Sequence, residues 1–156
     1  MSGVDYAGER AWLEQVLTRR IPLGAAMQLQ ILRLDARGIA LRAPLEPNVN
    51  DKGTAFGGAL ASMMILAGWS LPRLLLRRAG SRAELVIGRS ELVFLQPVRG
   101  VLVAECEWPP SADCSNFIRT LNERGRARIA LRAWINGAEK PAATLDARYA
   151  ALSTPP

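Results

Sequence analysis

The longest apolar segment of the chain lies near its middle. From Gly58 to Ala79 the sequence reads GALASMMILAGWSLPRLLLRRA, and its spacing predicts a helix with large apolar side chains around the whole circumference. A helix that is apolar on every side is either buried in a core or spans a membrane. Polar residues interrupt the stretch and the sequence contains no second one, so we expect a buried helix at the centre of the fold.

Alternating apolar and polar positions predict strands on both sides of this helix. Residues 27–43 alternate around a polar turn at residues 35–38, which is typical of a hairpin. Four apolar runs follow the helix and predict strands at residues 84–97, 101–108, 126–135 and 142–152. A turn separates the first two runs, and Asn136-Gly137 starts another between the last two, which predicts a second hairpin.

Two shorter helices are predicted outside the sheet. Residues Glu9–Arg20 place their apolar side chains on one face, with arginines near the C-terminal end. Residues 111–125 form a short helix or an ordered loop, with Ser111 or Asp113 as the expected N-cap and Gly125 as the expected end.

This order of elements predicts an α+β protein. In so short a chain, one antiparallel sheet wrapped around the long helix is the economical way to cover a helix that is apolar on all sides. The length of 156 residues suits a single domain, residues 1–156, with residues 1–8 and 153–156 frayed. Apolar residues make up 49% of the chain and charged residues 22%, as in a folded protein.

Composition narrows the chemistry. The chain has no histidine, which excludes a Ser-His-Asp triad, a Cys-His dyad, a histidine-dependent dehydratase and histidine-bound zinc. Cys106 and Cys114 are too few for a disulfide framework or a four-cysteine metal site, and the first residues do not resemble a secretory signal. We therefore expect a cytoplasmic protein with reduced thiols and no metal.

A net charge of +6, carried mostly by arginine, favours anionic partners. The arginines are spread along the chain and form no basic run of the kind that marks a nucleic-acid surface. Nucleic-acid binding rests on charge alone, and we expect neither a nucleic-acid partner nor a membrane span.

The loop that enters the long helix carries the most specific motif. It reads EPNVNDKGTAFGG, rich in residues that tolerate unusual backbone angles, and Ala67-Gly68-Trp69 follows within the helix. Together with the order of elements from about Leu13 to Leu152, this motif resembles the HotDog superfamily of thioesterases and dehydratases. Residues 48–58 and 67–69 are similar to the thioesterase domain found C-terminal to an acetyltransferase-like domain in some bacterial proteins.

The resemblance implies a HotDog fold, a curved antiparallel sheet wrapped around one long central helix. In that superfamily two subunits join their sheets edge to edge, and the thioester lies at their interface. The resemblance therefore implies a homodimer or tetramer that acts on an acyl thioester of coenzyme A or a carrier protein, without a cofactor. A physical argument supports pairing, because a second copy covers an otherwise exposed sheet edge.

Glycines at the start of the long helix are the candidates for binding the thioester carbonyl. Backbone N–H groups at a helix N-terminus can stabilise an oxyanion, and glycines let the carbonyl approach closely. In related thioesterases the glycine pair here follows a histidine and supplies the oxyanion contact, which implies Gly57 as the donor with Gly58 beside it. Tight packing of the helix on the sheet would also explain both glycines.

Activation of water is harder to assign. Many relatives place an acid on the first turns of the helix, yet residues 57–78 contain none. Asp51 in the preceding loop is the candidate base or nucleophile, although it also suits a turn. Asn48 and Asn50 are candidates for orienting water or the carbonyl through amide hydrogen bonds, or for building the loop.

Further candidates are expected to contact the substrate across the cleft, namely Thr54, Phe56 and Ser90. Arginines that could contact a coenzyme A phosphate, or be ordinary surface charges, are Arg89, Arg124, Arg126 and Arg128. Cys114 is not expected to be a nucleophile, because without an imidazole its thiol stays mostly protonated.

Three large side chains of the helix, Met63, Met64 and Trp69, either line an acyl tunnel or pack in the core, and core packing is the commoner role. The sequence thus predicts hydrolysis of an acyl thioester. The alternative is a non-catalytic acyl or acyl-carrier binding module, because the helix has no acid and the chain no histidine.

Overall fold

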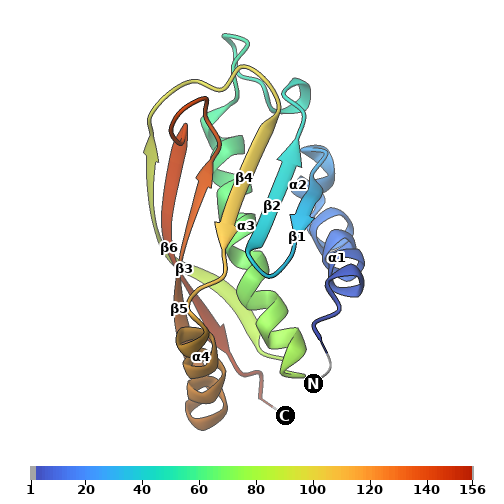
Figure 1. Ribbon diagram of the computed structural model, residues 1–156, viewed down its shortest axis with the longest axis vertical. Helices are drawn as coiled ribbons and strands as arrows, with labels where there is room; N and C mark the ends of the chain where they lie inside the picture. Colours follow the sequence, from blue (N-terminus) through green and yellow to red (C-terminus); the bar gives the residue numbers. More distant parts are fainter. Residues whose placement is uncertain (1–2, 156) are drawn as a thin grey trace.

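The computed structural model describes residues 3–155, and its central feature is a six-stranded antiparallel sheet curved around one helix (Figure 1). The sheet order is β1-β2-β4-β5-β6-β3. The strands are β1 (Gln30–Leu34), β2 (Gly38–Ala43), β3 (Glu84–Phe94), β4 (Leu102–Glu107), β5 (Arg126–Ile135) and β6 (Ala143–Leu152). The predicted α+β class and the sheet wrapped around a helix are confirmed.

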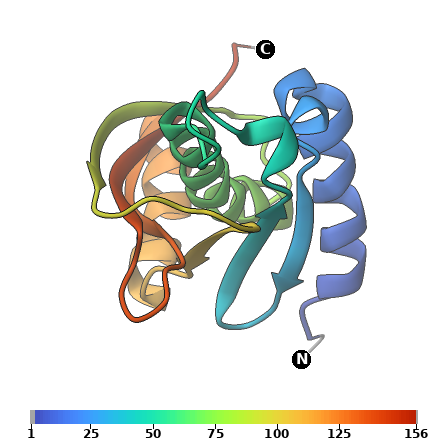
Figure 2. The same ribbon diagram turned by 90° about the horizontal axis from the view of Figure 1, so that it is seen from above.

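The long helix α3 (Gly57–Arg78) lies on the concave side of the sheet (Figure 2). Several of its large side chains are fully buried, namely Met63, Met64, Leu71, Leu74 and Leu76. Its length and hydropathy would also suit a membrane span, but 67% of its most apolar stretch is buried inside the fold. The helix is therefore the core of this fold, as predicted.

One glycine lets the sheet approach α3 closely. A Cβ on Gly68 would lie 2.5 Å from the Tyr149 hydroxyl oxygen, so only glycine admits the tyrosine ring of β6 at this point. The Tyr149 hydroxyl donates to the Ile65 carbonyl at 2.7 Å, and burial raises the pKa of Tyr149. Beside it, Trp69 Nε1 donates to the Leu85 carbonyl at 3.2 Å and ties α3 to β3.

Both predicted hairpins are present, but β3 and β4 are not neighbours. β1 pairs with β2 and β5 pairs with β6, each around the predicted turn. β3 pairs with β6 at the far edge of the sheet, whereas β4 lies between β2 and β5. The connection between β3 and β4 passes the entry of α3, where the Ala55 N–H donates to the Val98 carbonyl at 2.8 Å.

The N-terminal helices lie beside β1, at the edge of the sheet away from β3 (Figures 1 and 2). They are α1 (Tyr6–Gln15), the π-helical turn η1 (Val16–Arg20) and α2 (Pro22–Ala26). α1 begins three residues before the predicted Glu9, because the Asp5 carboxylate accepts a hydrogen bond from the Gly8 N–H at 2.9 Å and caps it. A short 3-10 helix, η2 (Glu46–Asn48), precedes the entry loop of α3.

The last helix, α4 (Ser111–Arg124), packs against β5. It ends at Gly125, as predicted, with φ of 72°. The predicted caps Ser111 and Asp113 are wrong, because Pro110 is the N-cap residue and no side chain caps this helix. The proline restricts φ and starts the helix early, so Asp113 falls in the first turn, where its charge favours the helix dipole.

Candidate active site

The N-terminus of α3 is open to a ligand. Phe56 is the N-cap residue, and its carbonyl accepts hydrogen bonds from the N–H groups of Ala59 and Leu60 at 2.9 and 3.1 Å. No side chain caps the helix, and its first turn has no acidic residue. Within residues 3–155, the N–H groups of Gly57 and Gly58 make no hydrogen bond, so they are free to bind an anion or a polarised carbonyl.

Two pockets flank this helix end, one beside each glycine. The α2-side pocket has a volume of about 340 Å³ and lies between α2, η2 and the first turns of α3, with a lining that includes Leu23, Ala26, Asn48, Phe56, Gly58 and Ser62. The β3-side pocket has a volume of about 370 Å³, with a lining that includes Gly57, Leu60, Phe94, Leu95, Gln96 and Pro97. Gly57 and Gly58, whose N–H groups are free, therefore line two separate pockets of similar size.

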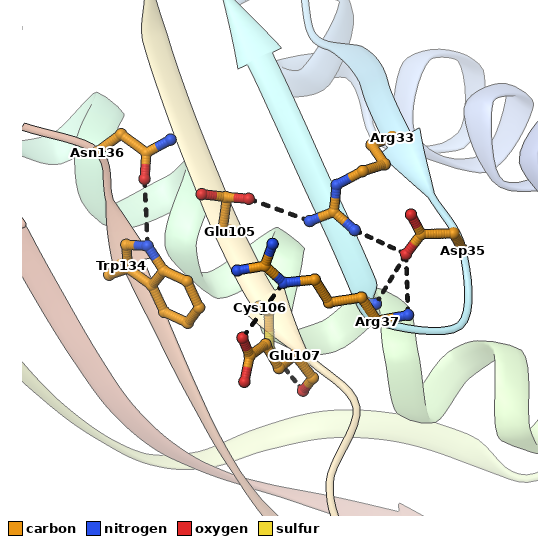
Figure 3. Close-up of polar contacts among 9 residues, drawn as sticks. Arg33, Asp35, Arg37, Glu105, Cys106, Glu107, Trp134 and Asn136 are labelled. Atoms are coloured by element: carbon orange, nitrogen blue, oxygen red, sulfur yellow. Dashed lines mark hydrogen bonds and ion pairs between the residues drawn. The ribbon is translucent and has the colours of Figure 1, made fainter.

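Neither pocket is lined by a charged side chain of the described residues. Charged groups pair with one another elsewhere, as at the β1–β2 turn and on β4 (Figure 3). There Arg33 bonds to Asp35 at 2.7 Å and to Glu105 at 3.0 Å, and Arg37 approaches Glu107 at 3.5 Å. The two pockets are thus uncharged, so no side chain that lines them offsets the partial positive charge of the helix N-terminus.

Asn48 joins three segments around the α2-side pocket. Its side chain is buried, and its Nδ2 donates to the Met27 carbonyl at 3.0 Å and to the Pro44 carbonyl at 2.8 Å. Its backbone carbonyl accepts a hydrogen bond from the Phe56 N–H at 2.8 Å. Both amide hydrogens are used, so the group that Asn48 can offer to a ligand in this pocket is its Oδ1, which is an acceptor.

Asn50 holds the entry loop together. Its Oδ1 accepts hydrogen bonds from the N–H groups of Lys52 and Thr54 at 2.8 and 3.1 Å. Its Nδ2 donates to Thr54 Oγ1 at 2.8 Å and to the Ala55 carbonyl at 3.5 Å. The loop turns at Gly53, with φ of 81°, and buries Thr54. Asn50 and Thr54 therefore meet each other and lie outside both pockets in a single chain.

The remaining predicted residues are not all brought together. The Asp51 side chain is 83% exposed, lies 3.1 Å from Lys52 and lines neither pocket. Ser90 is exposed on β3, opposite Ala147, and is also outside both pockets. Phe56 is exposed at the mouth of the α2-side pocket, with its ring over Gly58, where an added Cβ would lie 2.3 Å from Phe56 Cε1.

Comparison with known proteins identifies the family. A family model described as "Putative thioesterase (yiiD_Cterm)" matches residues 10–153. The chain belongs to this thioesterase family. Among solved structures, a protein of unknown function from Chlorobaculum tepidum TLS is 31% identical, with a TM-score of 0.92, over 96% of this chain and 97% of that one.

Two further solved structures are similar in fold. A protein from Shewanella oneidensis described as a "putative thioesterase" is 24% identical, with a TM-score of 0.82, over 94% of this chain and 99% of its own. A Pseudomonas aeruginosa protein described as a "Probable Thioesterase" is 22% identical, with a TM-score of 0.76, over 92% of this chain and 95% of its own. The HotDog fold that the entry motif implied is therefore confirmed for this member of the thioesterase family.

Neither the helix methionines nor the cysteines form part of the site. Met63 and Met64 are fully buried in the core and line neither pocket. Burial raises the pKa of the Cys106 thiol to about 12, and burial followed by the Asp113 charge raises the pKa of the Cys114 thiol. Within the described residues, no group of three or more His, Cys, Asp or Glu side chains could hold a metal ion.

Three of the four predicted arginines lie away from the open helix end. Arg124, Arg126 and Arg128 line a surface groove near the start of β5, whereas the β3-side pocket adjoins Phe94, which pairs with Ala143 at the start of β6. Since β6 is antiparallel to β5, that pocket lies near the opposite end of β5. In one chain, these arginines and the glycine pair are thus at opposite ends of the sheet.

The pocket residues Leu23, Ala26 and Ser62 were missed by sequence reasoning. Leu23 and Ala26 belong to α2, a five-residue helix between the predicted helix at Glu9–Arg20 and the predicted hairpin at residues 27–43, where no element was predicted. Folding brings α2 beside a helix that begins some thirty residues later, and no local pattern reports such a contact.

Proposed function

We propose that the protein hydrolyses an acyl thioester, most simply an acyl-CoA, at a cleft between two copies of the chain. The observation that supports this best is the uncapped N-terminus of α3, whose first two residues have free N–H groups and each line an uncharged pocket. Water adds to the thioester carbonyl, the resulting oxyanion binds to these N–H groups, and the C–S bond breaks to leave a carboxylic acid and a thiol.

In this proposal Gly57 donates to the oxyanion, with Gly58 beside it. An N–H group aimed at a developing oxyanion contributes most in a site from which water is excluded, and loss of one such donor typically slows a reaction about 100- to 1,000-fold. The Phe56 ring, which lies over Gly58, helps to exclude water from this point once a substrate is bound. Thr54 and Ser90 line neither pocket in one chain, so they are proposed as further substrate contacts only in a cleft that the second copy completes.

Asn48 and Asp51 are assigned to the water. The Oδ1 of Asn48 is the proposed acceptor for this water at the end of the α2-side pocket next to Gly58, which leaves the rest of that pocket to the substrate. Asp51 is the proposed general base, and Asn50 positions it by holding the loop. Because Asp51 is exposed in one chain, this role requires the second copy to cover the loop.

The exposed edge of β3 is the proposed contact between the two copies. Val86, Ile87, Val93, Phe94 and Leu95 along this edge are 37–52% exposed, and β3 pairs only with β6 among the described strands. A long apolar edge strand favours pairing with another chain.

We expect light scattering to give at least twice the chain mass of 17.0 kDa. Val86→Lys with Val93→Lys should give monomers, whereas Leu32→Lys on β1, at the other sheet edge, should not.

Thiol release from a panel of acyl-CoAs tests the hydrolysis. The wild type should release coenzyme A, and Asp51→Asn should slow release at least 100-fold. Glu46→Gln, which removes another acid just before the same loop, is the matched control and should act as the wild type does. If Asp51→Asn turns over as fast as the wild type, Asp51 is not part of the mechanism. If the wild type hydrolyses no acyl-CoA and no acyl-carrier protein, the proposed hydrolysis itself is contradicted.

A second function, a non-catalytic acyl-binding module, is favoured by one observation. Neither pocket is lined by a carboxylate of the described residues, so a single chain has no base beside the open N–H groups. Tight binding of acyl-CoA without thiol release would support this function over hydrolysis. Both functions suit the cytoplasm, where free cysteines such as Cys106 and Cys114 stay reduced.

A further inference from the structure

Three exposed apolar side chains surround the opening of the α2-side pocket. Leu23, Val49 and Phe56 are 43–57% exposed, and all three line this pocket, although they come from α2, the entry loop and the N-cap of α3. Scattered exposed apolar residues need no explanation, but apolar residues gathered around a hollow are typical of a ligand site.

Inside the pocket, the polar groups are mostly engaged with the protein. Ser62 Oγ donates to the Gly58 carbonyl at 2.8 Å, so its hydrogen is not offered to a ligand. The two amide hydrogens of Asn48 are bonded to the carbonyls of Met27 and Pro44. Such a pocket suits an apolar group better than a polar arm, which would need donors as well as acceptors.

We infer that the α2-side pocket binds the acyl chain of the thioester, and that the sulfur and the arm attached to it leave through the β3-side pocket. This inference rests on the proposed function, because a carbonyl held by Gly57 and Gly58 must direct its two substituents into the two flanking pockets. In the β3-side pocket, Gln96 Nε2 donates to the Lys140 carbonyl at 3.1 Å, which leaves its Oε1 as an acceptor for a polar arm. The pocket adjoins Phe94 at the sheet edge, so a long arm can continue along the proposed dimer contact.

The size of the pocket indicates a chain of medium length. Its volume of about 340 Å³ is near the lower limit of small-molecule sites, which span about 300–1,000 Å³. With about 30 Å³ for each water-sized group, the pocket holds about eleven such groups, so a chain of roughly eight to eleven carbons fills it. We therefore assign medium-chain acyl thioesters as the substrate class.

Binding of S-alkyl-CoA thioethers, which cannot be hydrolysed, tests this without turnover. For the wild type, calorimetry with chains from two to sixteen carbons should show affinity rising up to about fourfold per methylene and then levelling off at roughly eight to eleven carbons. Ala26→Phe places a ring in the pocket. It should lower the affinity for octyl-CoA at least tenfold and change the affinity for ethyl-CoA less than twofold.

Ala25→Phe is the matched control. Ala25 is an exposed neighbour of Ala26 on α2 but is not part of the pocket lining. The affinity of the Ala25→Phe variant should therefore depend on chain length as that of the wild type does. Leu23→Ala provides a second variant with little risk to folding, since Leu23 is exposed. It should weaken octyl-CoA several-fold and leave ethyl-CoA unchanged.

Two outcomes would overturn the inference. If Ala26→Phe and Leu23→Ala bind all chain lengths as the Ala25→Phe control does, the acyl chain lies elsewhere. If they weaken every ligand equally, unacylated coenzyme A included, the pocket holds the arm and not the acyl chain. Failure of hydrolysis is a separate result, because absent thiol release together with the predicted binding series would contradict catalysis but not the pocket.

Discussion

The two ends of α3 are built in opposite ways. At its C-terminal end, Arg78 binds the buried Glu9 of α1 through two hydrogen bonds of 2.7 and 2.9 Å, and its guanidinium lies 4.6 Å from the Trp108 ring. Arg73 and Arg77 stack on Trp12 at 4.8 and 5.0 Å. At its N-terminal end, the helix has no side-chain cap, no charge and an exposed phenylalanine.

This difference separates the structural end of the helix from the candidate functional end. Cations in the last turn favour the helix dipole, and the hydrogen bond with Glu9 raises the pKa of Arg78. The buried Glu9 carboxylate thus already has its partner within the protein. At the other end, the N–H groups lack partners, and a bound carbonyl would supply them.

Loss of the C-terminal ion pair should have the largest effect on stability. Arg78→Met leaves the Glu9 carboxylate buried without a partner, and should lower the free energy of unfolding by about 3–5 kcal/mol. Arg77→Met, one residue away, removes a stacking contact on Trp12 and should cost about 1 kcal/mol or less. Urea denaturation measures both, and equal costs would show that the Glu9 contact does not hold this end.

At the N-terminal end, Asn48→Asp should be the most damaging substitution of the loop. Aspartate keeps an acceptor oxygen but loses both donors, so a carboxylate would face the carbonyls of Met27 and Pro44. We expect a loss of about 2–4 kcal/mol, larger than the loss of about 2 kcal/mol for Asn48→Ala. Thermal unfolding compares the two, and a milder effect of aspartate would mean that the donor role of Asn48 is minor.

Alanine in place of a glycine at each end of α3 should have opposite consequences. A Cβ on Gly57 meets only Phe94 at 3.7 Å, so Gly57→Ala should raise stability by about 0.5–1 kcal/mol, yet slow thiol release about tenfold by narrowing the approach to the N–H. Gly80 has φ of 65°, so Gly80→Ala should cost about 1 kcal/mol and leave thiol release unchanged. If only Gly80→Ala slowed thiol release, the C-terminal end of α3 would be the functional end.

The smallest effect is expected from Cys114, which lines a surface pocket together with Arg78. Cys114→Ser should leave thiol release within about twofold of the wild type, because burial raises the pKa of the thiol and keeps it protonated at neutral pH. Alkylation of Cys114 should therefore be slow at pH 7 and accelerate only as the pH rises above the ordinary thiol value of about 8.5. Fast alkylation at neutral pH would place reactive chemistry at this end.

Local patterns predicted most of the elements of the fold. The apolar circumference of residues 58–79 identified the buried helix, and alternation around short turns identified both hairpins. Gly125 ends α4 as predicted, because helices commonly end at a residue in the left-handed conformation and glycine adopts that conformation at little cost. The order of strands was not accessible in this way, since alternation reports which face of a strand is apolar but not which strand lies beside it. Hence the separation of β3 from β4 came only with the structure.

The candidate site likewise has some features that the sequence predicted and others that only the structure showed. The sequence by itself determined the glycine entry of α3 and the absence of an acid from that helix, because both are properties of neighbouring residues. Only the tertiary structure decided that α2 and η2 form a pocket against Gly58, that Asn50 is engaged within its own loop, and that Asp51 is exposed. The pocket depends on contacts between segments distant in the chain, which packing of the whole core selects and no local pattern encodes. The Asn50 contacts span only four residues, but they depend on the exact course of the loop backbone, which the residue types alone do not give.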